Sequence, residues 1–561
     1  RIRHGLYHRA VAAKEKHLKV KREHQVRSAD LFAAVAEDSS VDPGIESEPG
    51  RRAGFRWWPA VMILVFGGGA MLVAWFALGL DRTYQVFSLW VLVPATVFAL
   101  LLWWLFASRL SWRTRGLGVL VVVAGLGTLR LEDYEGDMLP VVRFRWQPTR
   151  EEKTREYFAS VPEPATTAET QSLQAVDGDW PQFRGPRRDG KVTSVRLSRD
   201  WKSQPPRELW RHPVGQGWSS FAVVGDLAFT QEQRGRVEVV SCWNITTGEP
   251  VWAHEDADRF SEAMGGLGPR ATPTFYKSRI YSLGAAGRLN CLDAATGKPV
   301  WSKSQDVLEA TSGVNLSWAM SGSPLVVDGR VIVIPGGAKG GVAAFDAETG
   351  ELSWASGNHP ASYASPRIVE LNGQPRLLCF DGDGLTAYQF EDGTELWHQP
   401  WTNGPKVNAA LPILVDTDRV FVSSGYGQGC ALLKIDGDSQ QPSIAWQNRL
   451  LKCKFNDPVV HDGFVYGLDE GILVCLELET GKRRWKRGRY GYGQLLLVGD
   501  LIVVQAEKGQ VVLVEATPEK FRELGKFKAL SSKTWNHPVL VGNRLLVRNA
   551  GEMACYELPV E

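Results

Sequence analysis

The hydrophobic positions of this chain change their pattern about a quarter of the way along its 561 residues. Before that point lie two long apolar runs, residues 57–80 and 86–107, which contain no charged side chain. Each run is longer than the roughly 20 residues that an α-helix needs to cross the apolar core of a bilayer. Two successive runs of this length argue against a cleaved signal peptide. We therefore predict two membrane-spanning helices, with interfacial tryptophans near the ends of the runs: Trp57, Trp58, Trp103 and Trp104.

A third apolar run, residues 116–129, is short for a span, and its path decides on which side of the membrane the rest of the chain lies. Arginines are frequent before the first run and after the second, whereas Arg82 alone lies between them: Arg51, Arg52 and Arg56, then Arg109, Arg113 and Arg115. The positive-inside rule therefore places residues 1–56 and the loop 108–115 in the cytoplasm. If the third run also crosses, to about residue 130 with Arg130 reaching the interface, everything after it is periplasmic; otherwise the rest is cytoplasmic. We expect it to cross, in a multi-pass protein of the inner membrane.

The N-terminal arm, residues 1–56, begins with a strongly basic stretch. Residues 1–27 hold nine Lys or Arg and two Glu, which favours a solvated cytoplasmic arm close to anionic lipid. The net charge of +2 gives the whole chain no general attraction to nucleic acid, and we predict no nucleic-acid partner. After the membrane region (57–131), residues 132–179 are predicted to be a polar linker with a short helix at 151–158.

From about residue 180 the apolar runs become short, alternate with polar positions, and precede a recurring motif. Five copies match without gaps: CWNITTGEPVW, CLDAATGKPVW, AFDAETGELSW, AYQFEDGTELW and CLELETGKRRW. Each copy ends in Trp, has Gly four residues earlier and has Cys or Ala ten residues earlier. Asp-Gly and Gly-Asn pairs between the strands favour tight hairpins. A repeat of about 40–50 residues is typical of the four-stranded blades of a β-propeller.

Weaker copies complete the series. One ends at Trp446, another has Phe521 at the Trp position, and a last copy begins near Cys555 but is cut short by the end of the chain. A strand around Trp210, ahead of the first blade, can supply the missing part and close the ring. We therefore predict an all-β fold, an eight-bladed β-propeller over residues 180–561 preceded by transmembrane α-helices. Its repeat anchors are Trp210, Trp252, Trp301, Trp354, Trp397, Trp446, Trp485 and Phe521.

The other motif positions have expected structural roles. The Gly of each motif supplies a turn position with positive φ. The polar residue eight positions before the Trp can bond local backbone where it is Asn or Asp: Asn244, Asp293 and Asp346. Three cysteines share the register that other copies fill with Ala, so we expect them to be small, buried and unreactive: Cys242, Cys291 and Cys475.

The D-x-x-T-G-x-x-x-W repeats resemble those of the pyrroloquinoline quinone (PQQ) propeller superfamily. Residues 178–190, GDWPQFRGPRRDG, and the C-terminal stretch KTWNHPVLVGNRLLVRNAGEMACYEL are similar to those of membrane-tethered PQQ-like repeat proteins found in planctomycetes. The resemblance implies one of two functions. Quinoprotein dehydrogenases of this superfamily hold PQQ and Ca²⁺ in the propeller and oxidise alcohols or sugars. The outer-membrane assembly factor BamB and its relatives are non-enzymatic scaffolds that bind partner proteins.

Departures from the dehydrogenase pattern favour the scaffold. Such dehydrogenases carry an adjacent Cys-Cys pair and long insertions between blades, and this sequence has neither; it also lacks the C-x-x-C-H motif of a covalent haem. The lipidated Cys of BamB-type factors is missing as well, since the first Cys is Cys242. We predict a non-catalytic, membrane-anchored platform that binds an envelope protein or a ligand. The alternatives are a PQQ- and Ca²⁺-dependent membrane dehydrogenase and a sensor that signals to the basic arm.

Candidate binding residues precede the first strands of the blades. Polar residues stand before Pro in several of them, where the missing N–H of Pro suits a strand start: Thr272, Ser323, Ser365, Asp457 and His537. If these are inner strands, their side chains surround one mouth of the channel; the alternative is that they only form hydrogen bonds at the blade ends. A mixture of aromatic and amide residues close by suits a polar small molecule or a peptide. The predicted site is Trp318, Asn456, Asp457, Gln494, Trp535, Asn536 and His537.

No catalytic residue and no metal ligand is predicted from the sequence. The stretch FDGDGLTAY, with Asp381 and Asp383, resembles a calcium loop only superficially, because no Glu follows at the spacing of an EF-hand. It occupies the ordinary hairpin position of its blade.

Overall fold

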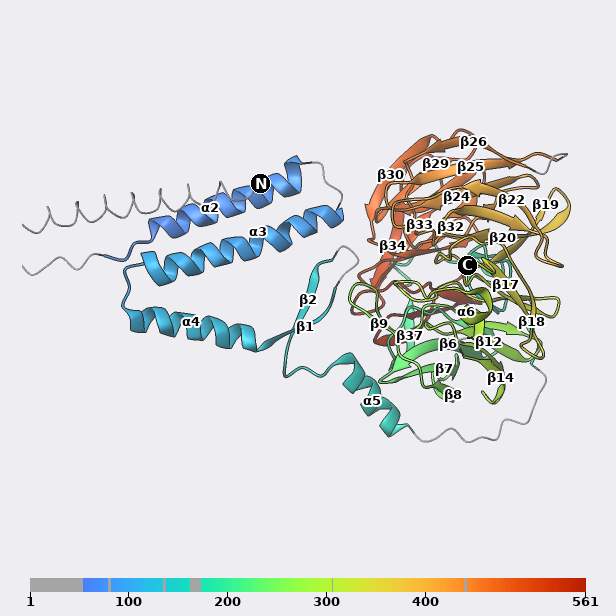
Figure 1. Ribbon diagram of the computed structural model, residues 1–561, viewed down its shortest axis with the longest axis horizontal. Helices are drawn as coiled ribbons and strands as arrows, with labels where there is room; N and C mark the ends of the chain where they lie inside the picture. Colours follow the sequence, from blue (N-terminus) through green and yellow to red (C-terminus); the bar gives the residue numbers. More distant parts are fainter. Residues whose placement is uncertain (1–53, 79–81, 135–137, 162–172, 305, 438–440) are drawn as a thin grey trace, which may run out of the picture. The chain divides into compact units, whose positions relative to one another are not determined.

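The computed structural model describes residues 54–561 apart from 79–81, 135–137, 162–172, 305 and 438–440 (Figure 1). The basic stretch expected in residues 1–27 lies outside this part of the chain. The described residues form two compact units, one of residues 54–63 with 98–115 and the other of residues 64–97 with 116–561. Within the first unit, the indole N–H of Trp103 donates to the carbonyl of Arg56 at 2.9 Å.

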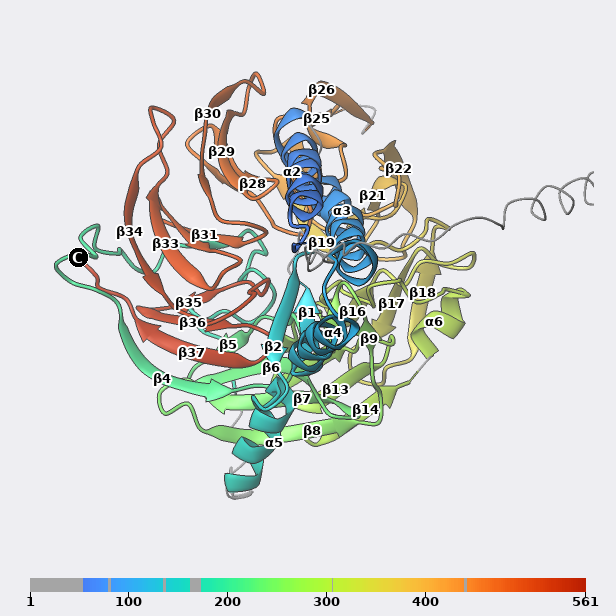
Figure 2. The ribbon, with the colours of Figure 1, turned by 90° about the vertical axis from the view of Figure 1, so that its left-hand side faces the viewer.

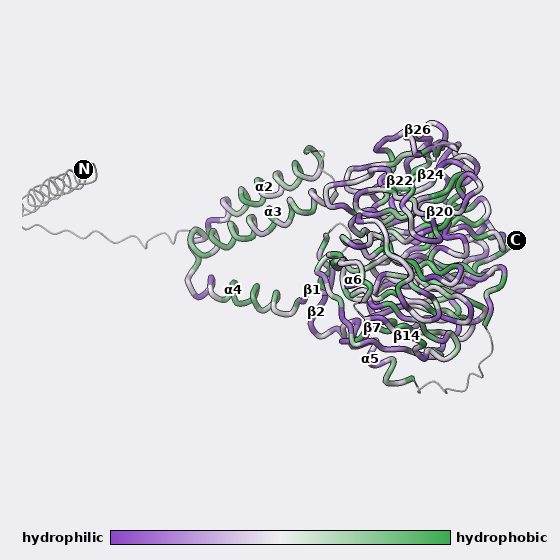
Figure 3. The backbone as a smooth tube through the Cα atoms, turned by 45° about the vertical axis from the view of Figure 1, so that its right-hand side comes forward, coloured by the Kyte–Doolittle hydropathy of each residue, from purple (hydrophilic) through white to green (hydrophobic). Residues whose placement is uncertain are grey.

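Three helices hold the apolar runs. They are α2, Trp58–Leu72, which continues in the π-helical turn η1, Val73–Ala77; α3, Arg82–Leu102, which continues in η2, Trp103–Ala107; and α4, Trp112–Gly127. By length and composition, Trp58–Ala77 and Tyr84–Ala107 could each cross a membrane, in agreement with the two predicted spans. Both are mostly apolar in Figure 3, and their large side chains are exposed instead of packed in a core. Exposed apolar side chains suit a helix that contacts lipid.

Eight sheets of four main strands form the blades of a propeller, as the repeats predict, and Figure 2 shows them arranged around a central axis, the channel axis of the propeller. The strands of each blade are antiparallel neighbours, and the first strand of each lies nearest to this axis. The first four blades are β5 Ala222–Val224, β6 Leu227–Arg234, β7 Val237–Asn244, β8 Pro250–Asp256; β11 Thr274–Tyr276, β12 Arg279–Leu283, β13 Leu289–Asp293, β14 Pro299–Lys303; β15 Leu325–Val327, β16 Arg330–Val333, β17 Val342–Asp346, β18 Leu352–Ser356; and β19 Arg367–Leu371, β20 Gln374–Phe380, β21 Gly384–Tyr388, β22 Glu395–Pro400.

The remaining blades follow the same order until the last. They are β23 Ile413–Leu414, β24 Arg419–Ser424, β25 Gly429–Ile435, β26 Pro442–Asn448; β27 Val459–His461, β28 Phe464–Asp469, β29 Ile472–Glu477, β30 Arg483–Arg489; β31 Gln494–Val498, β32 Leu501–Gln505, β33 Gln510–Glu515, β34 Glu523–Lys528; and β35 Val539–Val541, β36 Arg544–Arg548, β37 Glu552–Glu557 with β4 Arg207–Pro213. The short elements between them are β3 Lys191–Val192, β9 Ser261–Glu262, β10 Gly266–Leu267 and α6 Asp306–Thr311.

The last blade is completed by a strand from the start of the propeller. β4 pairs antiparallel with β37, and Trp210 lies opposite Cys555. The ring is therefore closed by backbone hydrogen bonds between the two ends of the propeller segment. Closure of this kind gives every blade a neighbouring blade on each side.

Five of the anchor tryptophans pack on the turn glycine of the next blade: Trp210, Trp252, Trp301, Trp354 and Trp446. A Cβ atom added to Gly297 would lie 2.4 Å from the Trp252 ring, and one added to Gly393 would lie 2.4 Å from the Trp354 ring. Both glycines also have positive φ, +70° and +75°. The indole N–H of Trp252 donates to the Ala294 carbonyl of the next blade at 3.0 Å. The motif thus links neighbouring blades, and its Gly is required both by the turn and by the close aromatic ring.

The other motif residues also have the expected roles. The Asp346 carboxylate accepts the backbone N–H groups of Glu348 and Thr349, at 2.9 and 2.8 Å, and so holds its turn. All seven cysteines are buried free thiols. Burial raises the pKa of Cys242 well above its ordinary value, so this thiol stays protonated and inert.

A hairpin and a helix lie between α4 and the propeller. The hairpin consists of β1, Leu129–Tyr134, and β2, Pro140–Phe144, and the helix is α5, Arg150–Ser160. A capping box begins α5, since Thr149 Oγ1 accepts the N–H of Glu152 at 2.9 Å and Glu152 accepts the N–H of Thr149 at 2.6 Å. The sequence predicts this helix but not the hairpin, which falls partly in the segment expected to be a linker.

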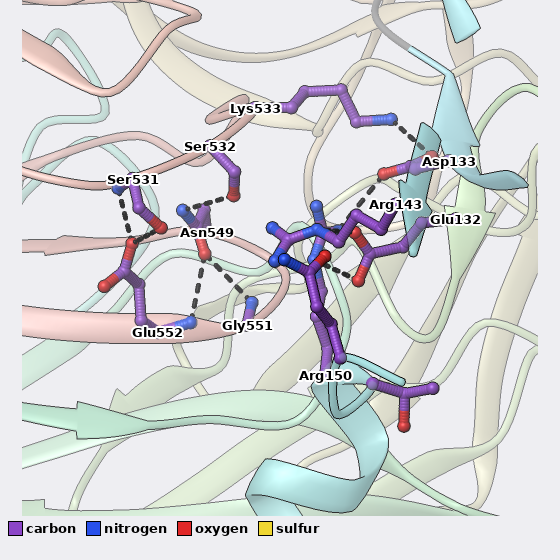
Figure 4. A network of polar contacts seen from close by, with 12 residues as sticks. Glu132, Asp133, Arg143, Arg150, Ser531, Ser532, Lys533, Asn549, Gly551 and Glu552 are labelled. Carbon is purple, nitrogen blue, oxygen red and sulfur yellow. Dashed lines mark hydrogen bonds and ion pairs between the residues drawn. The ribbon is translucent and has the colours of Figure 1, made fainter. Parts of the chain in front are cut away.

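Asp133 ties the hairpin to the propeller. Lys533 Nζ and Arg150 Nη1 donate to its carboxylate at 3.0 and 3.2 Å, and Figure 4 shows the two cations reaching it from different elements. The Lys533 side chain is 1% exposed, and its ammonium group lies 5.0 Å from the Trp218 ring and 4.3 Å from the Trp535 ring. The hairpin is therefore attached to the aromatic residues that surround the channel mouth.

Candidate functional site

A ring of hydrogen bonds links the starts of neighbouring inner strands. Thr272 Oγ1 accepts the N–H of Ser220 at 3.0 Å, and Ser323 Oγ accepts the N–H of Thr272 at 2.9 Å. The same bond recurs at the next blade, where Ser365 Oγ accepts the N–H of Ser323 at 2.8 Å. Asp457 likewise accepts the N–H of Leu411. Most of the polar residues before Pro therefore join one blade to the next. Blade-end bonding accounts for Thr272, whereas Ser323 and Ser365 make these bonds and also line the cavity at the channel mouth.

The segment 180–192 crosses the channel below this ring. It begins beside the first blade, where Trp180 pairs with Val223, and ends beside the seventh, where Lys191 pairs with Leu497. Between these points Arg188, which is 2% exposed, donates to the carbonyls of Ser323 at 3.2 Å and Pro366 at 2.8 Å. Burial lowers the pKa of Arg188 to about 9. We call residues 180–192 the channel strap, because they close the channel on one side.

A cavity of about 350 Å³ lies at the mouth of the channel, with the strap residue Phe183 in its wall. Its propeller lining comes mostly from the loops between successive blades and is dominated by aromatic side chains. Two ring pairs tighten the rim: Trp218 and Trp535 at 4.7 Å, and Trp318 and Tyr363 at 5.6 Å between centroids. The aromatic lining residues on the propeller are Phe183, Trp218, Trp318, Tyr363, Tyr426, Phe455 and Trp535.

Two cations stand among these rings. Lys454 Nζ lies 5.1 Å from the centre of the Tyr426 ring and 4.7 Å from that of Tyr492. The Arg270 guanidinium donates to the carbonyls of Gly265 and Gly266 at 3.1 and 3.2 Å, and burial lowers the pKa of Arg270 to about 10. The rim therefore combines aromatic faces with positive charge, which suits an apolar or aromatic group that carries a carboxylate.

Asp457 is the one carboxylate among the described residues that line the cavity. His537 Nε2 lies 3.3 Å from its Oδ2, and the Arg184 guanidinium lies 3.8 Å from the same oxygen. Burial raises the pKa of Asp457, and Arg184 opposes this effect. Burial, together with Arg184, lowers the pKa of His537 well below 6.5, so the imidazole is neutral at physiological pH.

This lining does not fit a bound Ca²⁺ ion. Calcium takes six to eight oxygen ligands, of which several are carboxylates. The cavity offers Asp457 alone, which already accepts the N–H of Leu411 and faces the cation Arg184. A divalent cation at this place would meet a neighbouring positive charge and too few oxygen ligands. The residues present thus do not supply the calcium-supported PQQ site that the resemblance to dehydrogenases implies.

The structure divides the seven residues predicted for the site into two groups. Trp318, Asp457, Trp535 and His537 line the cavity. The three amides are buried below the rim and donate to backbone carbonyls: Asn456 to Leu468 at 3.3 Å, Gln494 to Phe455 at 3.1 Å and Trp535 at 2.8 Å, and Asn536 to Gly217 at 3.2 Å and Ser219 at 2.7 Å. A binding role for the predicted residues is thus most direct for the first group.

Several lining residues escape the sequence analysis: Trp218, Arg270, Tyr363, Tyr426, Lys454 and Phe455. Four of them stand four or five residues before a strand start that the sequence does mark, namely Arg270, Tyr363, Lys454 and Phe455. An alignment of the loops before each inner strand would have revealed these four. Tyr426 lies in the turn between β24 and β25 and carries no comparable signal.

Comparisons with known proteins agree with this fold. The sequence profile of the family described as outer membrane protein assembly factor BamB matches residues 198–319, 236–487 and 357–527, which together span more than half of the chain. The outer membrane protein assembly factor BamB of Burkholderia pseudomallei is 26% identical over 361 residues, which are 61% of this chain and 85% of that protein. The quinohemoprotein alcohol dehydrogenase of Comamonas testosteroni is 34% identical over 253 residues, which are 44% of this chain and 30% of that protein. The crystal structure of that dehydrogenase superposes with a TM-score of 0.51 at 14% identity, covering 73% of this chain and 84% of that one; this shows a common fold alone.

Proposed function

The chain belongs to the family of the outer membrane protein assembly factor BamB, and we propose that it acts as a membrane-anchored, non-catalytic platform that binds another protein of the cell envelope. The observation that carries the proposal is the cavity at the channel mouth. It is lined mainly by aromatic side chains, its one carboxylate is bonded within the propeller, and the channel strap closes it from below.

Such a cavity has the features of a protein-binding site. Aromatic side chains and arginine supply most of the binding energy in protein interfaces, where they fill desolvated pockets. Trp318 and Tyr363 lie in loops between blades, so a partner can reach them without any change in the blades themselves. The cations Arg270 and Lys454 favour a partner segment with aromatic or apolar residues next to an acidic one.

We also propose that the propeller lies in the periplasm. The arginines before α2 and after α3 favour a cytoplasmic N-terminus, and α4 then returns the chain to the other side. A single introduced cysteine reports the side, because all seven native cysteines are buried. In spheroplasts, a membrane-impermeant maleimide should label Glu348→Cys on the propeller but not Ser28→Cys in the arm. The reverse pattern would place the propeller in the cytoplasm.

Photocrosslinking from the cavity tests the binding function. A benzoylphenylalanine in place of Trp318 keeps an aromatic group at the rim and should give a discrete crosslinked product in intact cells. The matched control is the same residue in place of Glu348, in the turn between β17 and β18. This turn lies at the opposite end of the blades from the loop of Trp318, because successive strands are antiparallel.

The two positions give a clear decision. A product that forms from position 318, fades when Tyr363 is changed to Ala, and is missing from position 348 supports the cavity as the binding site. Identical products from both positions, or none from position 318, would contradict it.

A further inference from the structure

A second group of chemically active side chains lies on the blade β19–β22. His359 comes from the loop after β18, Asp381 from the turn between β20 and β21, and His398 from β22. One possible ligand atom of each residue lies within 4.8 Å of the others. None of the three lines the channel-mouth cavity, so this cluster is a separate feature.

The Asp381 carboxylate is buried, 2% exposed, and makes no ion pair with Lys or Arg in the described part of the chain. Its Oδ1 accepts the N–H groups of Asp383 and Gly384 at 2.9 and 2.8 Å, and its Oδ2 accepts the hydroxyl of Thr386 at 2.6 Å. A carboxylate has about four lone-pair positions, so one remains open. A buried carboxylate without a permanent cation is costly unless a positive group joins it.

Thr386 also orients His398, which lies directly across from it on β22. Thr386 Oγ1 and His398 Nδ1 are 2.8 Å apart. Because the Thr386 hydroxyl donates its O–H to Asp381, its oxygen accepts a hydrogen bond from Nδ1–H of His398. The imidazole is thereby held as the Nδ1–H tautomer, with the lone pair of Nε2 free. Metal-binding histidines are commonly held in this way by a polar group on the other ring nitrogen.

The His359 ring completes the group and is the most loosely held. It stacks on His398 with centroids 4.1 Å apart and planes inclined by 10°. Its other contacts are long, 3.6 Å to Glu395 Oε2 and 3.9 Å to Asp383 Oδ2. The lone pair of an imidazole nitrogen lies in the plane of its ring, so the lone pairs of two stacked rings lie in separate, parallel planes. The His359 ring must therefore turn before both imidazoles can coordinate one ion. The long contacts offer little resistance to this rotation.

We propose that His359, Asp381 and His398 bind one divalent transition-metal ion of the zinc class. Two imidazoles and one carboxylate are typical ligands of Zn²⁺, whereas Ca²⁺ and Mg²⁺ require oxygen ligands. Three protein ligands leave a fourth position for water or for a donor group of a partner. The loop that carries His359 also carries Tyr363 of the cavity rim, so the ion fixes that loop to its blade. The proposal does not depend on the binding function assigned to the cavity.

The experiment is calorimetric titration of the full chain in detergent with Zn²⁺, combined with visible spectroscopy of the Co²⁺ form. The protein is purified without a histidine tag, and the four histidines of the arm are replaced by Gln to remove background binding: His4, His8, His17 and His24. We expect one Zn²⁺ per chain and the intense visible bands of tetrahedral Co²⁺. Both should be lost in His359→Ala and in His398→Ala, whereas His461→Ala on another blade should bind as before.

Substitution of Thr386 distinguishes a metal site with an oriented His398 from fortuitous binding by two nearby histidines. Thr386→Val removes the hydroxyl that holds His398 and should weaken Zn²⁺ binding about 10–100-fold, while Thr386→Ser should restore it. Circular dichroism and thermal unfolding in EDTA must match the parent protein for each variant that is compared. Zn²⁺ should raise the unfolding temperature of the parent but not that of His398→Ala. Absence of binding in the parent, or binding that survives loss of either histidine, would overturn the proposal.

Discussion

Glu238 on β7 is a buried carboxylate that makes no ion pair among the described residues. Its Oε2 accepts the N–H of Ala285 in the next blade at 3.0 Å, and its Oε1 has no hydrogen-bond partner. Burial, helped by the nearby carboxylates of Asp258 and Asp256, raises the pKa of Glu238 from 4.5 to about 7. Between these pH values the folded protein therefore keeps a proton that the unfolded chain has released.

This predicts a loss of stability with rising pH. Protonated Glu238 contributes stability that is fully present below pH 4.5 and is lost as the pH rises through about 7. This loss lowers the free energy of unfolding by up to about 3 kcal/mol. Glu238→Gln cannot release a proton, so its stability should fall less over this range. Urea unfolding of the full chain in detergent, followed by Trp fluorescence at pH 5 to 8, measures the difference. Glu348→Gln, an exposed control, should follow the wild type, and parallel curves for wild type and Glu238→Gln would refute the prediction.

Single residues also show how much of the structure can be predicted from the sequence. The shared register of Cys242 and Cys291 correctly predicts buried, inert thiols, because the repeat itself specifies that position. The buried Arg188 could not be predicted, since its carbonyl partners at Ser323 and Pro366 lie 135 and 178 residues away in the chain. Long-range partners of an arginine leave no local pattern.

The elements of the propeller are interlocked by the contact of Trp with Gly. Trp252 of one blade lies against Gly297 of the next and donates to the Ala294 carbonyl at its turn. The same arrangement recurs from Trp446 to Gly481 and, by hydrogen bond, to Leu478 at 2.7 Å. Each blade is therefore stabilised by its neighbour as well as by its own strands.

Gly297→Ala should reveal the strength of this interlock. The new Cβ would lie 2.4 Å from Trp252 and would also strain a turn with φ of +70°. We expect a loss of about 2–5 kcal/mol in unfolding free energy, from backbone strain of about 1–2 kcal/mol and overpacking of about 1–3 kcal/mol. Gly463→Ala is the matched control, because φ is +79° there and no atom lies within 4 Å of the added Cβ. Chemical unfolding should show the smaller, strain-only loss for Gly463→Ala, and equal losses for the two variants would rule out the interlock.

The repeat predicts the blades well, because a strand pattern and a turn recur in each. The degenerate copy at Trp446 falls on the expected blade, where Trp446 pairs with Leu432. The prediction for Phe521 is wrong, because Gly525 takes the position opposite Leu513 that the motif Trp holds in the other blades. Phe521 precedes β34 and instead packs against Trp485 of the preceding blade, with ring centroids 5.7 Å apart. The hairpin β1–β2 escapes prediction, since its strands are short and carry charged residues such as Glu132 and Asp133 that take part in ion pairs. Those partners are visible only once the chain is folded.

At the scale of the whole molecule, apolar helices of membrane-spanning length precede a closed propeller of the BamB family. Three residues of the predicted site, Trp318, Trp535 and His537, precede inner strands and line the channel-mouth cavity. The sequence does not reveal that Gln494 and Asn536 turn toward backbone carbonyls, since the direction of a side chain at or before a strand start depends on the neighbouring blade. It also does not reveal the channel strap that closes the cavity from below.

The measurement that most directly tests a non-catalytic role is calorimetric titration of PQQ into the full chain in detergent, with and without Ca²⁺. The single cavity carboxylate, Asp457, is bonded to Leu411 and faces Arg184, so we predict no binding at high micromolar PQQ in either condition. Stoichiometric, Ca²⁺-dependent binding of PQQ would contradict the scaffold and would establish this propeller as the cofactor site of a dehydrogenase.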